Sequence, residues 1–308
     1  MQTVIKSSRI SKNYKGFQAV KDVSLNICKG EIYGFIGLNG SGKTTTIRML
    51  LGMIKPTEGA CYIKGEKVTS TNHRIWRSVG HIVETPHCYP ELTVLENLEI
   101  FRRIRLMSDP EIVPRVMEQL HLTRYAQKKA RNLSLGNTQR LGIAKALLHS
   151  PEILILDEPM NGLDPSGIVE IRTLLQDLAL NKGVTILMSS HLLREVAKIA
   201  TKIGIIHKGR LIQEIESMQL SERLNQQLVI DTRNNASAIS QLTTAGYASK
   251  INNDGLIETT DGRAIRNPDE ISRLLVYTGF APTTLTVKEE NLESYFLKIT
   301  EREGEKLQ

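Results

Sequence analysis

The sequence predicts an α/β protein with a parallel sheet covered by helices, followed by a small α+β domain. A chain of 308 residues with 40% hydrophobic and 24% charged residues suits a folded domain of about 200 residues with a smaller one behind it. Helical patterns alternate with short apolar runs as far as about residue 215. Strands that are apolar on both faces are typical of a parallel sheet buried between helices, and four runs have this character: Ile32–Ile36, Ile153–Leu156, Val184–Met188 and Ile203–Ile206.

A helical insertion is expected within this first domain. Val94–Ile104 and Glu111–His121 have helical patterns, and no convincing strand falls between residues 92 and 136. We therefore expect a first domain of residues 1–215 that contains a helical subdomain over about residues 85–140.

Residues 216–308 are expected to form a separate accessory domain, because shorter strand-like and helix-like stretches alternate there. The expected strands are Gln227–Asp231, Leu256–Thr259 and Thr284–Val287. The expected helices are Ala236–Ala245, Asp269–Thr278 and Glu290–Thr300. Asn253-Asp254-Gly255 is a hairpin signal, since these residue types tolerate the backbone conformations of tight hairpin turns.

The charge and the cysteines restrict the possible partners and the compartment. Lys+Arg total 40 against 33 Asp+Glu, a net charge of +7, which suits either simple solubility or an anionic partner. No Lys/Arg run resembles a nucleic-acid-binding arm, so we expect no nucleic-acid partner.

Cys28, Cys61 and Cys88 are odd in number, and their spacing fits no metal or redox motif. They indicate free thiols in a reduced compartment.

The apolar patterning favours a cytoplasmic protein. The first residues lack the apolar core of a signal peptide, and no apolar run approaches the ~18 residues needed to cross a bilayer. If the protein serves a membrane process, we expect another chain to supply the membrane part.

Residues 37–44 read Gly-Leu-Asn-Gly-Ser-Gly-Lys-Thr, the P-loop pattern GxxxxGK[ST]. The predicted strand Glu31–Ile36 before it and the predicted helix Thr44–Gly52 after it supply the required context. Glycines let successive N–H groups approach a phosphate at a helix N-terminus, Lys43 adds a positive charge, and the Thr44 hydroxyl suits Mg²⁺. We therefore expect ATP and Mg²⁺ to bind here, with these nucleotide-binding residues: Gly37, Leu38, Asn39, Gly40, Ser41, Gly42, Lys43, Thr44 and Thr45.

Two acids follow the buried run that ends at Leu156. Carboxylates at the end of a buried strand need a cation, so Asp157 is the expected Mg²⁺ partner. Glu158 is placed to orient or deprotonate the attacking water as a general base. The guanine-selective Asn-Lys-x-Asp pattern is absent, since Asn181-Lys182-Gly183 is followed by Val184. The pattern therefore favours an ATPase over a GTPase.

These motifs together resemble the ATP-binding subunit of ABC transporters, over residues ~4–215. Leu133-Ser134-Leu135-Gly136-Asn137 stands where that family has its Leu-Ser-Gly-Gly-Gln signature. Gly162-Leu163-Asp164-Pro165 resembles its D-loop, and Ser189-Ser190-His191 resembles its switch histidine. Tyr14 matches its adenine-stacking aromatic, although Tyr14 could also be plain core packing.

The resemblance implies a composite site between two ATP-binding subunits. In the family, the N-terminus of the signature helix, here expected over Leu135–His149 with Ser134 as its cap, faces the γ-phosphate held by the opposite subunit. Ser134, Gly136, Asn137 and Asp164 would contact the partner's nucleotide, and His191 would sense the γ-phosphate as a second catalytic residue. One chain has one P-loop and one signature, so a dimer with two sandwiched ATP molecules is implied, either of identical or of related chains.

Within the family, the chain resembles the ATPases of bacitracin-resistance and lantibiotic-immunity exporters. These proteins also carry Glu where other members have Gln, here Glu84, and they favour Ser-Leu-Gly, as at Ser134-Leu135-Gly136. Leu292-Glu293-Ser294-Tyr295-Phe296-Leu297 resembles the closing motif of drug-type exporter ATPases. We expect Glu84 to contribute to the metal site and to link the nucleotide to the membrane partner. The implied function is to power a separate permease that exports a membrane-active peptide antibiotic, from the cytoplasmic face of the membrane.

Two other functions remain compatible with the motifs. One is a soluble ABC ATPase that acts on the ribosome or on nucleic acid. The translation-factor type normally has two cassettes and the DNA-repair type has long coiled coils, and neither feature is present. The other is a nucleotide-gated module that senses the antibiotic through the permease, a role that the C-terminal domain could serve.

Overall fold

The computed structural model of the chain describes residues 2–84, 86–219, 226–289, 295–296 and 299–300. The chain divides into two compact units, Met1–Ser217 and Met218–Gln308. Each unit has its own hydrophobic core and is described separately below.

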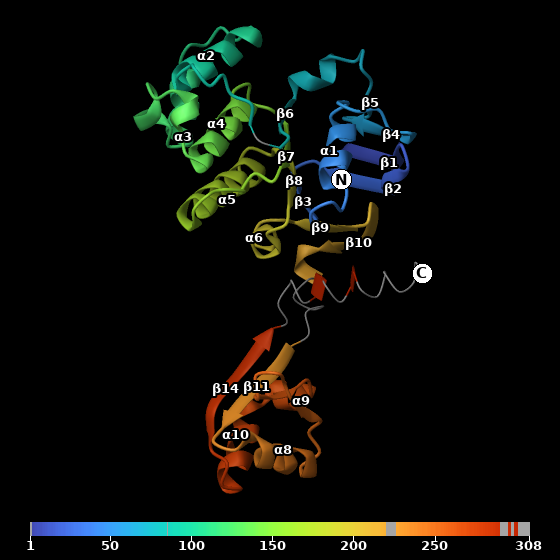
Figure 1. The fold of residues 1–308 in the computed structure, drawn as a ribbon, viewed down its shortest axis with the longest axis vertical. Coiled ribbons are helices and arrows are strands. Elements are labelled where there is room, and N and C mark those ends of the chain that lie inside the picture. The colour runs from blue at the N-terminus through green and yellow to red at the C-terminus, as the bar shows by residue number, and fades with distance from the viewer. Residues whose placement is uncertain (1, 85, 220–225, 290–294, 297–298, 301–308) are drawn as a thin grey trace. The chain divides into compact units, whose positions relative to one another are not determined.

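A six-stranded sheet forms the centre of the first unit (Figure 1). Its strand order is β10-β9-β3-β8-β7-β6. The strands are β3 (Ile32–Ile36), β6 (Val79–Ile82), β7 (Ile153–Asp157), β8 (Thr185–Ser190), β9 (Lys202–His207) and β10 (Arg210–Glu216). Neighbouring strands from β9 to β6 are parallel, and only β10 is antiparallel to its neighbour. All four apolar runs of the sequence lie in this sheet, so the predicted α/β class is confirmed.

A second, antiparallel sheet packs beside the first with a helix between them. Its strands, in the order β2-β1-β4-β5, are β1 (Thr3–Tyr14), β2 (Phe17–Cys28), β4 (Glu58–Ile63) and β5 (Glu66–Lys67). The helix is α1 (Lys43–Leu50). Ile47 and Leu50 of α1 share one buried core with Leu25 of β2 and with Phe35 and Ile155 of the central sheet. This packing fixes the start of α1 at the end of β3.

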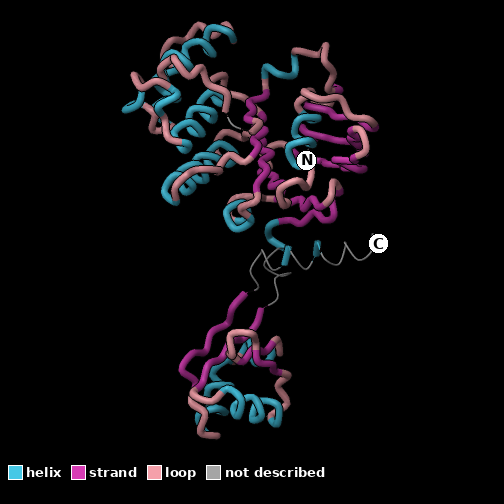
Figure 2. The backbone as a smooth tube through the Cα atoms, in the orientation of Figure 1, coloured by secondary structure: helices cyan, strands magenta, loops and turns pink. Residues whose placement is uncertain are grey.

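Helices cover the other side of the central sheet (Figures 1 and 2). They are α2 (Val94–Ile104), α3 (Ile112–Gln119), α4 (Leu135–Leu147) and α5 (Pro165–Leu180), with the short α6 (Leu193–Ala197) after β8. The observed α2 has the predicted bounds. It begins with a capping box, in which the Thr93 side chain accepts from the Glu96 N–H and the Glu96 carboxylate accepts from the Thr93 N–H. The part of 92–136 that the structure describes contains helices and turns and no strand of a named sheet.

The second unit is a four-stranded antiparallel sheet with helices packed on one face. Its elements are β11 (Gln226–Thr232), α8 (Asn235–Thr244), β12 (Ser249–Ile251), β13 (Ile257–Thr259), α9 (Gly262–Arg266), α10 (Pro268–Tyr277) and β14 (Pro282–Glu289). The βαββαβ succession and the strand order β12-β13-β11-β14 are those of the ferredoxin-like fold. β12 and β13 pair as a hairpin around Gly255, at the predicted turn.

Part of the C-terminal sequence prediction falls outside the described residues. In the predicted helix Glu290–Thr300, residues 290–294 and 297–298 are not described. The same holds for most of the exporter-type closing motif, of which Tyr295 and Phe296 alone are described.

Candidate functional site

The P-loop connects β3 to α1 and has the shape of an anion cradle. Gly40 and Gly42 have φ angles of 77° and 107°, which side-chain-bearing residues rarely adopt. A Cβ on Gly37 would lie 2.5 Å from the Ile206 carbonyl oxygen. The Ser41 hydroxyl is buried without a hydrogen-bond partner among the described residues. A loop that needs its glycines and leaves a buried hydroxyl unpaired fits the triphosphate expected from the sequence.

Lys43 is the first residue of α1 and is only 6% exposed. Its Nζ donates to the carbonyl oxygens of Gly37 at 2.7 Å and Leu38 at 3.3 Å, and lies 3.5 Å from Glu158 Oε1. A buried ammonium group needs such partners. The P-loop therefore holds its cation at the centre of the cradle, next to the carboxylate expected to act as general base.

The site also has the oxygen donors that Mg²⁺ prefers. Asp157, the last residue of β7, is 2% exposed, and its Oδ2 accepts a hydrogen bond of 2.8 Å from Thr44 Oγ1. Mg²⁺ is usually held by one or two carboxylates together with substrate phosphates. A buried carboxylate beside a P-loop hydroxyl thus fits the metal expected from the sequence.

Glu158 brings together residues from three elements. Its Oε2 accepts from His191 Nδ1 at 2.8 Å and from the His191 N–H at 3.3 Å, while Oε1 faces Lys43. Because a carboxylate can only accept, the neutral His191 ring carries its hydrogen on Nδ1. Sequence reasoning missed a further residue here: Ser189 Oγ contacts both Asp157 and Glu158. The only signal for Ser189 in the sequence was its position two residues before His191.

Glu84 has a partner that the sequence did not reveal. Its Oε1 lies 2.6 Å from Arg48 Nη2, in the last turn of α1. The Arg48 and Glu84 side chains are 36% and 56% exposed. The structure thus pairs Glu84 with a cation of the P-loop helix, whereas its predicted surroundings were the metal and the two acids.

The residues expected to face a second subunit gather in a different groove. Ser134, Gly136, Asn137 and Asp164 all line it, and we call it the signature groove. Ser134 caps α4, since its hydroxyl accepts from the Asn137 N–H at 3.3 Å, as predicted. Within the described residues, no hydrogen bond or ion pair joins these four residues to the P-loop.

Leu135 and Asp164 show how the signature groove is built. The Leu135 side chain packs over Gly162, where an added Cβ would lie 2.3 Å from Leu135 Cδ2, yet Leu135 remains 58% exposed. Asp164 caps α5 by accepting from the Gly167 N–H. Hydrogen bonds from the Ser166 hydroxyl and from that N–H lower the pKa of Asp164 below its ordinary value, so it stays ionised.

Tyr14 lies at the end of β1 and is 46% exposed. The Lys12 ammonium lies 5.4 Å from its ring centroid. This exposure rules out the core-packing role that the sequence left open. A half-exposed ring at a strand end is compatible with adenine stacking.

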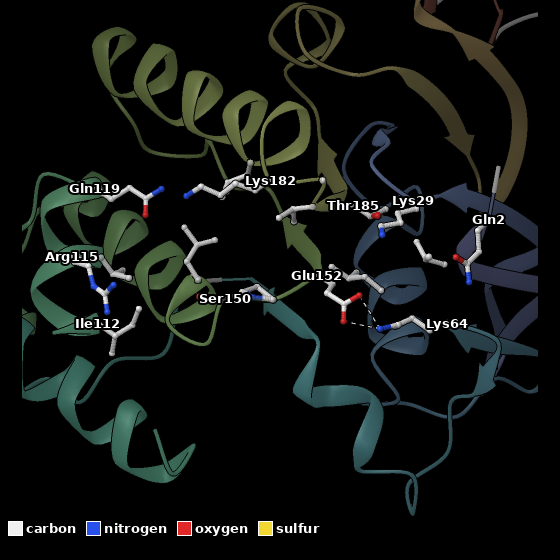
Figure 3. Close-up of a pocket in the computed structure, with 18 residues that line it drawn as sticks. Gln2, Lys29, Lys64, Ile112, Arg115, Gln119, Ser150, Glu152, Lys182 and Thr185 are labelled. Atoms are coloured by element: carbon white, nitrogen blue, oxygen red, sulfur yellow. Dashed lines mark hydrogen bonds and ion pairs between the residues drawn. The ribbon is translucent and has the colours of Figure 1, made fainter. Parts of the chain in front are cut away.

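A separate pocket lies at the amino-terminal ends of the central strands, opposite the ends that carry the P-loop and the two acids (Figure 3). It is lined by Glu152 and Thr185, which adjoin the N-terminal ends of β7 and β8, and by basic side chains that include Lys64. Glu152 holds Lys64 at 2.7 and 2.9 Å. Ligands of open α/β sheets bind at the carboxyl ends of the strands, where the P-loop and Asp157 lie. We therefore assign the chemistry to the P-loop edge.

Comparison with known proteins agrees with this geometry. The sequence profile of the ABC transporter family matches residues 20–161. The bacitracin transport ATP-binding protein BcrA of Bacillus licheniformis is 40% identical over 301 residues, which cover 97% of this chain and 98% of BcrA. The chain belongs to the ABC transporter ATP-binding subunits. It is an ABC-type ATPase subunit related to the bacitracin and lantibiotic transport ATPases.

Other relatives of this ATPase subunit differ in how much of the chain they match. The lantibiotic transport ATP-binding protein SrtF of Streptococcus pyogenes is 36% identical over 233 residues, which cover 75% of this chain and all of SrtF. The dimeric post-hydrolysis structure of the ATP-binding cassette MJ0796 bound to ADP and Pi matches with a TM-score of 0.65 at 28% identity. That match covers 69% of this chain and 98% of the cassette. No helix among the described residues is long and apolar enough to span a membrane.

Proposed function

We propose that this ATPase subunit powers a separate membrane permease that exports a peptide antibiotic of the bacitracin type. The observation that carries the ATPase part is the contact of Lys43, Glu158 and His191 over the P-loop, next to the Thr44–Asp157 pair. The BcrA match over nearly the whole chain supports the transport part. Through its permease, the subunit would sit on the cytoplasmic face of the membrane.

Nucleotide binding would use hydrogen-bond donors of the P-loop that are now unpaired or that donate to carbonyl oxygens of the loop itself. Lys43 would exchange the Gly37 and Leu38 carbonyl oxygens for the β- and γ-phosphate oxygens, whose negative charge makes them stronger acceptors. The unpaired Ser41 hydroxyl and the N–H groups from Leu38 to Thr45 would donate to the same phosphates. Tyr14 would stack on the adenine.

Hydrolysis would depend on the two acids and on His191. Glu158 would accept the proton of a water whose oxygen attacks the γ-phosphorus, and the bond to the ADP oxygen would break. His191, hydrogen-bonded to Glu158, would hold that carboxylate in place and contact the transferred phosphate. Thr44 and Asp157 would hold Mg²⁺, with Glu84 nearby, and bound Mg²⁺ would neutralise the phosphate charge.

A second ATP-binding subunit would complete each site. The signature groove has an exposed helix N-terminus capped by Ser134, whose positive end suits an anion, but no hydrogen bond or ion pair of the described residues links it to this chain's own P-loop. Ser134, Gly136, Asn137 and Asp164 would therefore contact the nucleotide held by the partner. The partner would be a second copy or a related chain.

Glu84 would transmit the nucleotide state to the permease. It follows β6 and is paired with Arg48 of α1, the helix that begins at Lys43. A shift of α1 when the phosphates bind would move this ion pair, and with it the segment that follows Glu84.

The extent of the matches favours the bacitracin type over the lantibiotic type. SrtF leaves about a quarter of this chain unmatched, whereas BcrA covers nearly all of it. A chain that carries the extra length of BcrA is best compared with BcrA itself.

Drug sensitivity in cells tests this function. We expect cells that express this chain with its cognate permease to tolerate more bacitracin than cells with the permease alone, and Lys43→Ala to abolish the difference. A panel that includes lantibiotics identifies the substrate class. Unchanged tolerance to all of them, with both proteins present in the membrane fraction, would contradict the proposed transport function.

A further inference from the structure

We infer that Ser189 is a positioning residue, which holds the expected metal ligand Asp157 and the expected general base Glu158 in one fixed arrangement. The inference rests on the proposed hydrolytic roles of the two acids. It assigns to Ser189 a task that the P-loop, the signature and the histidine do not perform.

The position of Ser189 follows from the strand order. β8 lies between β3 and β7, and Ser189 is in register with Asp157 on one side and with Phe35, near the start of the P-loop, on the other. Ser189 is fully buried. Its side chain therefore sits at the carboxyl edge of the sheet, between the strand that carries the acids and the strand that carries the P-loop.

The Ser189 hydroxyl uses both of its hydrogen-bonding functions on the two acids. The O–H group donates to Asp157 Oδ1 at 2.5 Å, and its oxygen accepts from the Glu158 N–H at 3.0 Å. A hydroxyl has one hydrogen to donate, so this pairing fixes its direction. Asp157 is then held at both oxygens, because Thr44 donates to Oδ2.

Glu158 needs such a hold because its backbone is in an unfavourable conformation. Its φ angle is 51°, in the left-handed region that residues with a Cβ populate rarely. Such a conformation persists only where the surroundings determine it. Ser189 ties the Glu158 amide, and Gln139 Nε2 donates to the Glu158 carbonyl oxygen at 3.3 Å. These two hydrogen bonds hold the backbone of Glu158, and its carboxylate contacts Lys43 and His191.

The neighbouring Ser190 offers a matched control. It is 1% exposed on the same strand, and its hydroxyl accepts from the Leu192 N–H at 2.9 Å. The two serines differ in their contacts, because the hydrogen bond of the Ser190 hydroxyl involves neither acid. Substitution at Ser190 removes a buried hydroxyl of equal size from the same strand and leaves the acids tied.

The experiment compares Ser189→Ala with Ser190→Ala in the full-length protein. Partners that orient a metal ligand typically change metal affinity or activity by about 10–100-fold when removed. We expect Ser189→Ala to lower the kcat for ATP by about that factor and to raise the half-saturating Mg²⁺ concentration about tenfold, while ATP affinity without Mg²⁺ stays within about threefold. Ser190→Ala should leave all three within about twofold.

Hydrogen exchange gives a readout that needs neither nucleotide nor metal. Loss of the acceptor should speed exchange of the Glu158 amide in Ser189→Ala by about tenfold or more, and leave it unchanged in Ser190→Ala. Ser189→Cys repeats the test with nearly the native volume and a weak hydrogen-bonding group, and serves if the alanine variant does not fold.

Three results would overturn the inference: wild-type kcat and Mg²⁺ dependence in Ser189→Ala, or in Ser189→Cys; unchanged exchange at Glu158; or equal losses in Ser190→Ala. Glu158→Gln separates this failure from that of the proposed function. If Glu158→Gln stops turnover and Ser189→Ala keeps the wild-type kcat and Mg²⁺ dependence, only the role of Ser189 is wrong. If Glu158→Gln hydrolyses ATP normally, the proposed hydrolytic role itself fails.

Discussion

Acidification should destabilise the first unit through His149, which follows the end of α4. Its Nε2 lies 3.1 Å from the Val79 carbonyl oxygen on β6, so the neutral ring carries its hydrogen there. Its Nδ1 is buried without a partner among the described residues. Burial, reinforced by the nearby Arg105 and His81, lowers the pKa of His149 from 6.5 to about 4, because a proton on Nδ1 would find no acceptor.

The loss of stability on acidification follows from the difference between the pKa values of His149 in the folded and unfolded states. Above the unfolded-state pKa of 6.5 the ring is neutral in both states, so its contribution to stability is fully present. As the pH falls towards the folded-state pKa of about 4, the unfolded chain binds the proton first and that contribution is lost. Between about pH 7.5 and about pH 5 the free energy of unfolding should fall by about 2 kcal/mol from this group alone.

Urea unfolding at the two pH values, followed by Trp76 fluorescence, measures this loss. Trp76 is the single tryptophan and packs against the core of the same unit, so it reports on the unit that contains His149. Other groups titrate as well, and His149→Gln, which cannot be protonated, isolates the His149 share. The wild type should lose about 2 kcal/mol more than His149→Gln over this range. Equal losses in the two proteins would show that the pKa of His149 does not differ between the folded and unfolded states.

Two further predictions concern the site. Lys43→Ala removes a buried cation that lies beside Glu158, so ATP binding should weaken by at least about tenfold. Binding is measured with a fluorescent ATP analogue. An affinity within about twofold of the wild-type value would contradict the P-loop assignment. Glu84→Gln removes only a partly exposed ion pair worth about 0–1 kcal/mol, so ATPase activity should be largely kept, whereas Glu84→Ala should uncouple hydrolysis from transport. Full drug resistance in cells that carry Glu84→Ala would show that Glu84 has no coupling role.

The local parts of the site could be predicted from the sequence because each lies within a short segment. The P-loop, its preceding strand and α1 are continuous in the chain, and Asp157 and Glu158 directly follow the apolar run of β7. The Ser134 cap is also local, since its acceptor and donor are three residues apart. These features required no knowledge of how the strands are arranged.

The contacts between segments could not be predicted in the same way. Ser189 meets Asp157 only because β8 lies next to β7, and Arg48 meets Glu84 only because α1 packs near the end of β6. The direction of Leu135 was likewise left open, and it depends on Gly162 lying beneath the start of α4. Such pairings are set by the tertiary structure, and a single sequence carries no signal for them.

Irregular strands explain most of what the sequence missed in the fold. β1 and β2 are each 12 residues long, yet their pairing shifts register between Ser7 and Ile10 and again before Lys12. Each shift interrupts the two-residue alternation by which a half-buried strand is recognised. The antiparallel sheet was therefore not predicted, whereas the uniformly apolar strands of the central sheet were.

The most direct test of the account is the state of association of Glu158→Gln with Mg·ATP, measured by light scattering on a sizing column. We predict that this variant binds ATP without cleaving it and doubles its mass from 34.5 kDa, while Lys43→Ala in the same background stays monomeric. Adding the cognate permease should not remove this dependence on nucleotide. A Glu158→Gln protein that binds ATP yet remains monomeric, with and without the permease, would contradict a nucleotide site shared between two copies of this chain.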